Sequence, residues 1–481
     1  MDIGVEQVRH YRLRGHHLDR KLPPKGLLAA AGACGVQNSP PGAWETALFN
    51  RLENCCLRDL RWALEEEKTL LQAWSYRGVP VVFPTAESGV FLTPLVARPG
   101  EEPWIYTRGI TLALDFLGMT FEELLPLVEE AVHTCLADRT IHSKEALDQA
   151  LADAVCPGLP PEKQALWDAP SMYGRPDRQT VGGAVVSFLL RPCAFSSLVV
   201  FGARQAGSPV FTSFSAWTGQ APAPCPDGER ELVRKYLRCY GPSTAADFAA
   251  WLGSSPKQAR RLWNSLAEEL MPVQVEGRTR YLPAGELDAL TESGGEEERL
   301  LLLGPHDPYL DLRDRWVVLP HPALQRRVWR TVSNPGALVQ DGKILGTWTA
   351  KVRGERMEVR IDAWDDLTTW QRSRRRPMRH SGNGNWQHSA WTGNTEFGGP
   401  ALTFGGRADI ITHVYSEEEE KYPSRCCIEN PWTVKRGERT AANTPWSWHP
   451  NGVCPVGVLR ERPLPRCRVM ARREAVSVRG R

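Results

Sequence analysis

Residues 227–283 read DGERELVRKYLRCYGPSTAADFAAWLGSSPKQARRLWNSLAEELMPVQVEGRTRYLP, and this stretch indicates how the chain folds. Asp227 is a residue type that caps helices, and the apolar residues from Leu232 to Tyr240 recur at helical spacing. Gly241-Pro242 then stops the helix, because proline cannot continue it. The stretch therefore begins with one amphipathic helix of about three turns.

Two further helices and a hairpin are expected after this stop. Ser243 or Thr244 is positioned to cap a short second helix that ends at Gly253. Ser255 followed by Pro256 is typical of the start of a third helix. Strand-like runs over 272–276 and 279–283 follow it. Three helices with a tight second turn, followed by a hairpin, are the layout of a winged helix-turn-helix.

The third helix of this unit is the candidate recognition helix. Its polar face carries four side chains that suit contacts with bases or phosphates, Lys257, Arg260, Arg261 and Asn264. Glu268 and Glu269 would repel phosphates, so only the first two turns could touch DNA. The alternative is an ordinary solvated helix face, and the pattern alone does not choose between them.

Two looser copies of this layout precede it. In the second copy, Thr120 and Glu123 form a capping box, Ser143 caps a second helix, and Val181–Leu190 is the third. A hairpin is expected over 198–214. The first copy is expected to have helices near 25–34, 43–52 and 57–74 and a strand over 79–83. Repetition of one module therefore builds most of the chain.

A β-rich unit and an irregular tail complete the sequence. The strand–Asp341-Gly342–strand pattern is a strong hairpin signal. We expect an α+β protein with tandem winged helix-turn-helix units, then a small β-rich domain and a poorly structured C-terminal tail. The expected boundaries are 1–115, 116–224, 225–295, 296–366 and 367–481. The tail is basic, possesses no regular period, and is either a flexible DNA-contacting extension or not the natural end of the gene.

Composition narrows the class of protein. Hydrophobic residues make up 42% and charged residues 24%, which is ordinary for a globular protein. No membrane-spanning run or signal peptide is visible, so a cytoplasmic location, nucleoid-associated in a prokaryote, is expected. The 12 cysteines are scattered, which favours buried thiols over a metal site. The net charge of +3 combines a basic tail with a slightly acidic body, so DNA contacts would be local.

Several separated motifs resemble the AlkZ/YcaQ-like DNA glycosylases. They are YLRCYGPST at 236–244, LLLGPHDPYL at 301–310, RDR at 313–315 and DGKILGTW at 341–348. The match runs from about residue 10 to 364 in the family's order and leaves out the tail. The resemblance implies tandem winged helices around duplex DNA. It also implies hydrolysis of the N-glycosidic bond of alkylated purines and unhooking of interstrand cross-links.

The resemblance also implies a catalytic position near residue 37. The family's motif is Gln-x-Gln or Gln-x-Asp, whereas this chain has Gln37-Asn38-Ser39. A glutamine amide can orient a water, but a serine hydroxyl is a poor base by itself. Glu45 is a candidate replacement for the missing carboxylate. The alternative is that Glu45 only favours the positive end of its helix.

Other candidate residues have two interpretations each. The family's Arg-Gly-Thr-x-His segment reads Arg77-Gly78-Val79-Pro80-Val81, so only its arginine and glycine remain, and Arg77 is a candidate DNA contact. Arg313 and Arg315 could bind phosphate, or Asp314 between them could form an internal ion pair. His16 and His17 are expected to be surface or packing residues, and His306-Asp307 to form a structural hydrogen bond.

Three functions are compatible with the sequence. The first is a monofunctional DNA glycosylase that binds double-stranded, alkylated DNA and needs no metal or other cofactor, with Gln37 orienting water and Ser39 or Glu45 assisting. The second is a noncatalytic winged-helix DNA-binding protein with a degraded site. The third is an interaction module that does not bind DNA. The retained Gln37 favours the first function, and the missing carboxylate, threonine and histidine favour the second.

Overall fold

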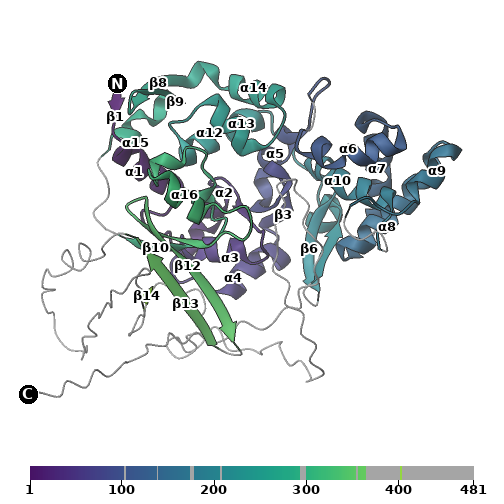
Figure 1. Ribbon diagram of the computed structural model, residues 1–481, viewed down its shortest axis with the longest axis horizontal. Helices are drawn as coiled ribbons and strands as arrows, with labels where there is room; N and C mark the ends of the chain where they lie inside the picture. Colours follow the sequence, from purple (N-terminus) through teal and green to yellow (C-terminus); the bar gives the residue numbers. More distant parts are fainter. Residues whose placement is uncertain are drawn as a thin grey trace, which may run out of the picture.

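In a computed structural model, the described residues form three β-sheets with helices packed around them, which confirms a mixed α+β fold (Figure 1). The structure describes residues 1–364 and 401–402, except 102–103, 138, 174–177, 206–207, 293–298 and 354–355. The tail that we expect to be irregular, 367–481, lies outside the described residues apart from 401–402.

The segment 227–283 contains the predicted elements in the predicted order. They are α12 (Gly228–Tyr240), α13 (Ala245–Leu252), α14 (Pro256–Ser265), β8 (Leu270–Val275) and β9 (Arg278–Pro283). The Thr244 and Ser255 side chains cap α13 and α14, and Gly253 ends α13 with a φ of 70°. Asp227 stands at the N-cap of α12 without capping it, because its carboxylate pairs with Arg234 instead.

The N-terminus of the chain packs onto this same segment. Strand β1 (Asp2–Ile3) pairs in parallel with β8, and helix α1 (Val5–Gly15) lies on α12. A Cβ atom at Gly15 would stand 2.0 Å from the carbonyl oxygen of Arg238, so the close approach of the two helices requires a glycine. Residues at opposite ends of the described chain therefore share one hydrophobic core.

A six-stranded sheet joins the first and second segments of the chain. Its strand order is β2 (Val36–Gln37), β4 (Pro80–Pro84), β3 (Leu70–Trp74), β6 (Val200–Gln205), β7 (Ser208–Thr212) and β5 (Ile141–His142). The helices of the first segment are α2 (Leu27–Gly32), α3 (Ala43–Phe49), α4 (Leu57–Arg61), a π-helical turn (Trp62–Glu66) and α5 (Ser88–Phe91).

The prediction of a helix over 57–74 is wrong in its last third. The helical turns end at Glu66, Lys68 has a left-handed φ of 55°, and Leu70–Trp74 is a central strand. Every residue of that strand is buried. A short, fully apolar run has no alternation that separates a buried strand from a buried helix, which explains the error.

A group of helices packs beside β6, on the right in Figure 1. They are α6 (Trp104–Leu117), α7 (Phe121–Leu136), α8 (Lys144–Val155), α9 (Pro161–Trp167) and α10 (Val181–Phe195), with α11 (Phe214–Thr218) following the sheet. The predicted capping box of Thr120 and Glu123 and the predicted Ser143 cap are both present. The expected boundary at residue 115 falls within α6, which packs on α10.

The last described part is a five-stranded sheet with short helices. Its strands follow the order β10 (Leu300–Leu303), β11 (Gly336–Gln340), β12 (Lys343–Arg353), β13 (Arg356–Ala363) and β14 (Ala401–Leu402). Asp341 and Gly342, with φ values of 49° and 74°, form the predicted hairpin turn. Helices α15 (Leu287–Thr291) and α16 (Pro322–Val328) flank β10 in the chain, and the loop 304–319 crosses to the other segments.

Candidate active site

Gln37 is buried, and its amide group is held at both ends. Strand β2 pairs Gln37 with Val81 of β4, which fixes the backbone. The side-chain Nε2 donates to the carbonyl oxygen of Ser39 at 3.0 Å. The Oε1 accepts a hydrogen bond from Nη2 of Arg77 at 3.2 Å. The amide therefore has one orientation, with its oxygen toward the Arg77 guanidinium.

Arg77 links three segments that are distant in the sequence. It follows β3 in a left-handed conformation with a φ of 58°. Its Nη1 donates to the carbonyl oxygen of Trp251 in α13 at 3.1 Å, and its Nη2 donates to Oδ2 of Asp311 at 2.7 Å. Burial opposes the charge of Arg77, but the Asp311 carboxylate outweighs it and raises the pKa of Arg77 above its ordinary value.

The loop 304–319 supplies three carboxylates, each paired with an arginine from another segment. Asp307 forms a bidentate pair with Arg51 at the end of α3, with 2.9 Å for both hydrogen bonds. Asp311 pairs with Arg77, as described above. The third carboxylate, Asp314, is bound by arginines from α1 and β9, Arg12 and Arg280. These pairs fix the loop against the first and third segments.

Asp314 forms an internal ion pair, as the sequence suggested, but its partners are not the neighbouring Arg313 and Arg315. The partners of Asp314 are Arg12, at 2.7 Å, and Arg280, at 2.8 Å. Burial would raise the pKa of Asp314, but the Arg12 and Arg280 charges outweigh burial and hold it below its ordinary value. The Asp314 carboxylate binds these distant arginines because it lies between α1 and β9, and not beside the side chains of Arg313 and Arg315.

Arg313 and Arg315 lie beside the Arg77–Asp311 pair. Burial, and then the neighbouring charge of Arg77, lower the pKa of Arg313. Its Nε atom is buried and has no hydrogen-bond partner within the described part of the chain. Burial likewise lowers the pKa of Arg315, whose guanidinium lies 4.6 Å from the centre of the Trp329 ring. The positive charges of Arg313 and Arg315 are thus only partly neutralised by the protein, which favours the binding of an anion such as a phosphate.

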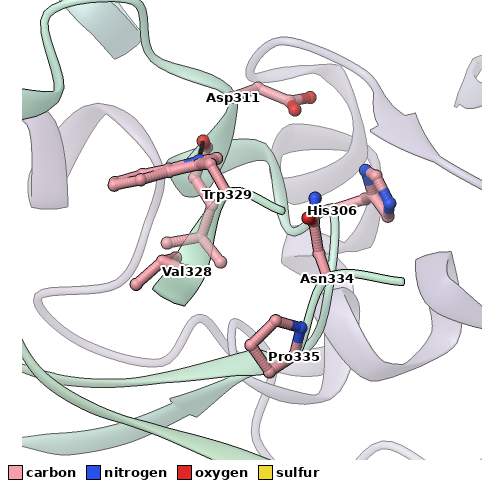
Figure 2. A pocket seen from close by; sticks show the side chains of 7 residues that line it. His306, Asp311, Val328, Trp329, Asn334 and Pro335 are labelled. Atoms are coloured by element: carbon pink, nitrogen blue, oxygen red, sulfur yellow. Dashed lines mark hydrogen bonds between the residues drawn. The ribbon is translucent and has the colours of Figure 1, made fainter. Parts of the chain in front are cut away.

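Asp311 also lines a small pocket. Figure 2 shows the Asp311 carboxylate at one end of it, with Trp329 and His306 on opposite sides. Leu310, Val328, Asn334 and Pro335 complete the lining. Burial lowers the pKa of His306; the Asp311 carboxylate opposes this shift and the Arg77 charge adds to it, and the lowered pKa leaves the imidazole neutral at pH 7. The pocket combines an aromatic face with a carboxylate, an amide and a neutral imidazole.

Ser39 and Glu45, the two candidates for assisting Gln37, are held by other contacts. The backbone carbonyl of Ser39 accepts the hydrogen bond from Gln37, and the residue is half-buried. The Glu45 carboxylate pairs with Arg61 of α4 at 3.3 Å. Ser39 thus supports the amide through its backbone, and Glu45 is engaged with a neighbouring helix.

The polar residues of the candidate recognition helix α14 differ in their exposure to solvent. Lys257, Arg260 and Asn264 are exposed. Arg261 instead pairs with Glu101 and Glu229, and its side chain is 17% exposed. The Arg261 guanidinium thus connects α14 to the start of α12. A helical projection of α14 alone does not show this contact.

The buried histidine is His16. It packs edge-on between Tyr240 and Tyr309, with ring centres 5.0 and 5.5 Å away. Burial, and then the charge of Arg51, lower its pKa well below the ordinary value. The expectation of a packing role therefore fits His16. Asp307 forms an ion pair with Arg51 in addition to the expected structural hydrogen bond, which it accepts from the backbone of Tyr309.

Asp311 and its pocket were not predicted from the sequence. The only local sign is that the motif 301–310 ends one residue before a second aspartate, four positions after Asp307. Within the described ranges, no group of three or more His, Cys, Asp or Glu side chains is arranged to hold a metal ion. The same ranges contain no helix that is long and apolar enough to cross a membrane.

Comparison with known proteins identifies the class. Residues 30–378 match the family model described as "DNA glycosylase AlkZ-like", so the chain belongs to the AlkZ-like DNA glycosylase family, as its motifs indicate. It is 25% identical over 367 residues to an interstrand DNA cross-link repair glycosylase of Streptomyces sahachiroi, covering 72% of this chain and 88% of that protein.

The solved structure of the Streptomyces sahachiroi DNA glycosylase AlkZ is also similar to this fold. The TM-score is 0.58 at 21% identity, and the similarity covers 75% of this chain and 91% of the other. This likeness concerns the fold, whereas the family match concerns the sequence.

Proposed function

We propose that this protein is a monofunctional DNA glycosylase that hydrolyses the N-glycosidic bond of alkylated purines in duplex DNA. Membership in the AlkZ-like family supports the class of reaction. The observation in this chain that supports the proposal most strongly is the amide of Gln37, which Ser39 and Arg77 hold in one orientation. A preorganised polar group of this kind lowers the barrier without reorganising during the reaction.

The chemistry demands little acid from the protein. A purine alkylated at N7 or N3 already carries positive charge, so it leaves readily and takes the bonding electrons with it. The remaining work is to place a water at C1′ and to stabilise an oxocarbenium-like transition state. An amide oxygen has two lone pairs, so Oε1 of Gln37 can bind Arg77 and still accept a hydrogen from that water.

Duplex binding is assigned in this proposal to two surfaces. Helices α12–α14 and the β8–β9 hairpin are a winged helix-turn-helix, and Lys257, Arg260 and Asn264 of α14 enter the major groove. Arg313 and Arg315 hold a backbone phosphate near the damaged nucleotide, because their charges are only partly neutralised by the protein. The similar Streptomyces protein is named for interstrand cross-links, so a cross-linked purine belongs to the proposed substrate class.

The test uses duplex DNA that contains one N7-methylguanine. The wild-type protein is expected to leave alkali-labile abasic sites, and Gln37→Ala to lower the single-turnover rate at least about 100-fold. Arg77 keeps its bond to Asp311 in that variant, so the fold should survive. Glu45→Gln is the matched control, because its carboxylate pairs with Arg61, and it should retain the rate within about threefold.

A noncatalytic DNA-binding protein is the second candidate, and one observation favours it. The residue that would complete the pair with Gln37 is Ser39, whose contact with Gln37 is through its backbone. Strand breaks no more frequent than with Gln37→Ala, together with salt-dependent duplex binding, would support this second function for that lesion.

A further inference from the structure

Gln37 and Asp311 share one nitrogen atom of Arg77. The Nη2 atom donates to Oε1 of Gln37 at 3.2 Å and to Oδ2 of Asp311 at 2.7 Å. These two oxygens are therefore at most about 6 Å apart, and one water molecule can donate a hydrogen to each of them when they lie within about 5 Å. The side chains come from positions 37 and 311, and only the folded chain brings them together.

We propose that Asp311 is the catalytic carboxylate of this enzyme and that Arg77 positions it against Gln37. The inference rests on the glycosylase function proposed above. The oxygen of the bridging water attacks C1′ of the damaged nucleotide, and a proton of that water passes to the Asp311 carboxylate. The C1′–N9 bond breaks and its electron pair neutralises the cationic purine. The products are the free alkylated base and an abasic sugar, and Asp311 then releases the proton to solvent.

Burial and pairing separate Asp311 from the other carboxylates nearby. Asp307 is fully buried in a bidentate pair, and Asp314 is enclosed by Arg12 and Arg280. Glu45 pairs with Arg61. The Asp311 side chain, by contrast, is 17% exposed and lines the pocket, while Arg77 binds its Oδ2 atom.

The chemistry of the cluster suits this assignment. A carboxylate can take a proton from water, which the hydroxyl of Ser39 does poorly by itself. The second hydrogen of the water can remain on the Gln37 oxygen during attack. Trp329 and His306 line the same cavity as Asp311, whose volume of about 20 Å³ is enough for one water molecule, and His306 does not add positive charge at pH 7. In this assignment Gln37 orients the water and Asp311 accepts its proton.

The decisive variant is Asp311→Asn, which keeps the size of the side chain and removes the proton acceptor. We expect its single-turnover rate on N7-methylguanine duplex to fall at least about 100-fold, with the Kd for the duplex within about threefold of wild type. Asp311→Glu, which retains a carboxylate, should be faster than Asp311→Asn.

The outcomes separate this assignment from the proposed function. If wild type is active and Gln37→Ala is inactive, but Asp311→Asn keeps the wild-type rate, Asp311 is not the catalytic carboxylate and the glycosylase function stands. A loss of duplex affinity in Asp311→Asn as large as the loss of rate would also overturn it, because Asp311 would then act in binding. If wild type forms no abasic sites in this duplex, both proposals fail.

Discussion

The loop 304–319 contains two kinds of aspartate–arginine pair. The pairs of Asp307 with Arg51 and of Asp314 with Arg12 and Arg280 are buried, with each side chain at most 7% exposed. The pair of Asp311 with Arg77 is more open, at 17% and 13%. All three aspartates pair a carboxylate with a guanidinium group, so the pairs differ only in how far the surrounding residues bury them. Enclosed pairs fix the loop, whereas the open pair retains an accessible carboxylate beside Gln37.

The largest effect should come from breaking an enclosed pair. Asp307→Ala leaves the Arg51 guanidinium buried without its carboxylate, which should lower the free energy of unfolding by about 3–5 kcal/mol. Asp311→Ala should cost only about 1–2 kcal/mol, because Arg77 keeps its bonds to Gln37 and Trp251 and is nearer to solvent. Urea unfolding measures both, and equal losses would remove the distinction between the two kinds of pair.

An intermediate effect is expected from pH, through the buried His16 next to the enclosed pairs. Its folded-state pKa is lowered by burial and by Arg51, so below about pH 6.5 the unfolded chain binds a proton that the folded chain does not. Stability is unaffected by this group at higher pH and falls as the pH drops. Between pH 7.5 and 5.5 the contribution is about 1.4 kcal/mol.

The variant His16→Gln should make unfolding less dependent on pH by about that amount, although it lowers stability at both values. Part of the dependence should remain, because burial also lowers the pKa values of His17 and His306. Urea unfolding at the two pH values provides the measurement. An unchanged difference between them would show that His16 is not the group responsible.

The smallest effects are expected from variants of α14, where Arg260 is exposed and Arg261 is in ion pairs. Arg260→Ala, at an exposed position, should reduce the salt dependence of duplex binding by about one unit of slope and weaken affinity for all sequences alike. Arg261→Ala is its neighbour with the same loss of charge, but Arg261 pairs with Glu101 and Glu229. It should change the slope little and lower the Tm more. The reverse result would place the DNA contact at Arg261.

The sequence predicts best the features that depend on neighbouring residues. The caps at Thr120, Ser143, Thr244 and Ser255 and the turn at Asp341-Gly342 are each specified by a few consecutive positions. The strand Leu70–Trp74 was missed because its burial depends on neighbours from elsewhere in the chain.

The candidate site was predicted only in part for the same reason. Gln37 and Arg77 follow from the family's motifs, but their hydrogen bond spans 40 positions, and the pair of Arg77 with Asp311 spans 234. No periodicity or spacing encodes such a contact. Arg261 shows the converse, since a helical projection places it with the exposed residues while Glu101, from a distant loop, covers it.

The parallel pairing of β1 with β8 has a consequence for how the protein is made. Asp2 and Ile3 pair with Gln274 and Val275, so about 270 further residues must be synthesised before these two find their partners. Arg12 likewise waits for Gly241 and Asp314. During that interval the face of α1 that packs on α12 has no partner helix.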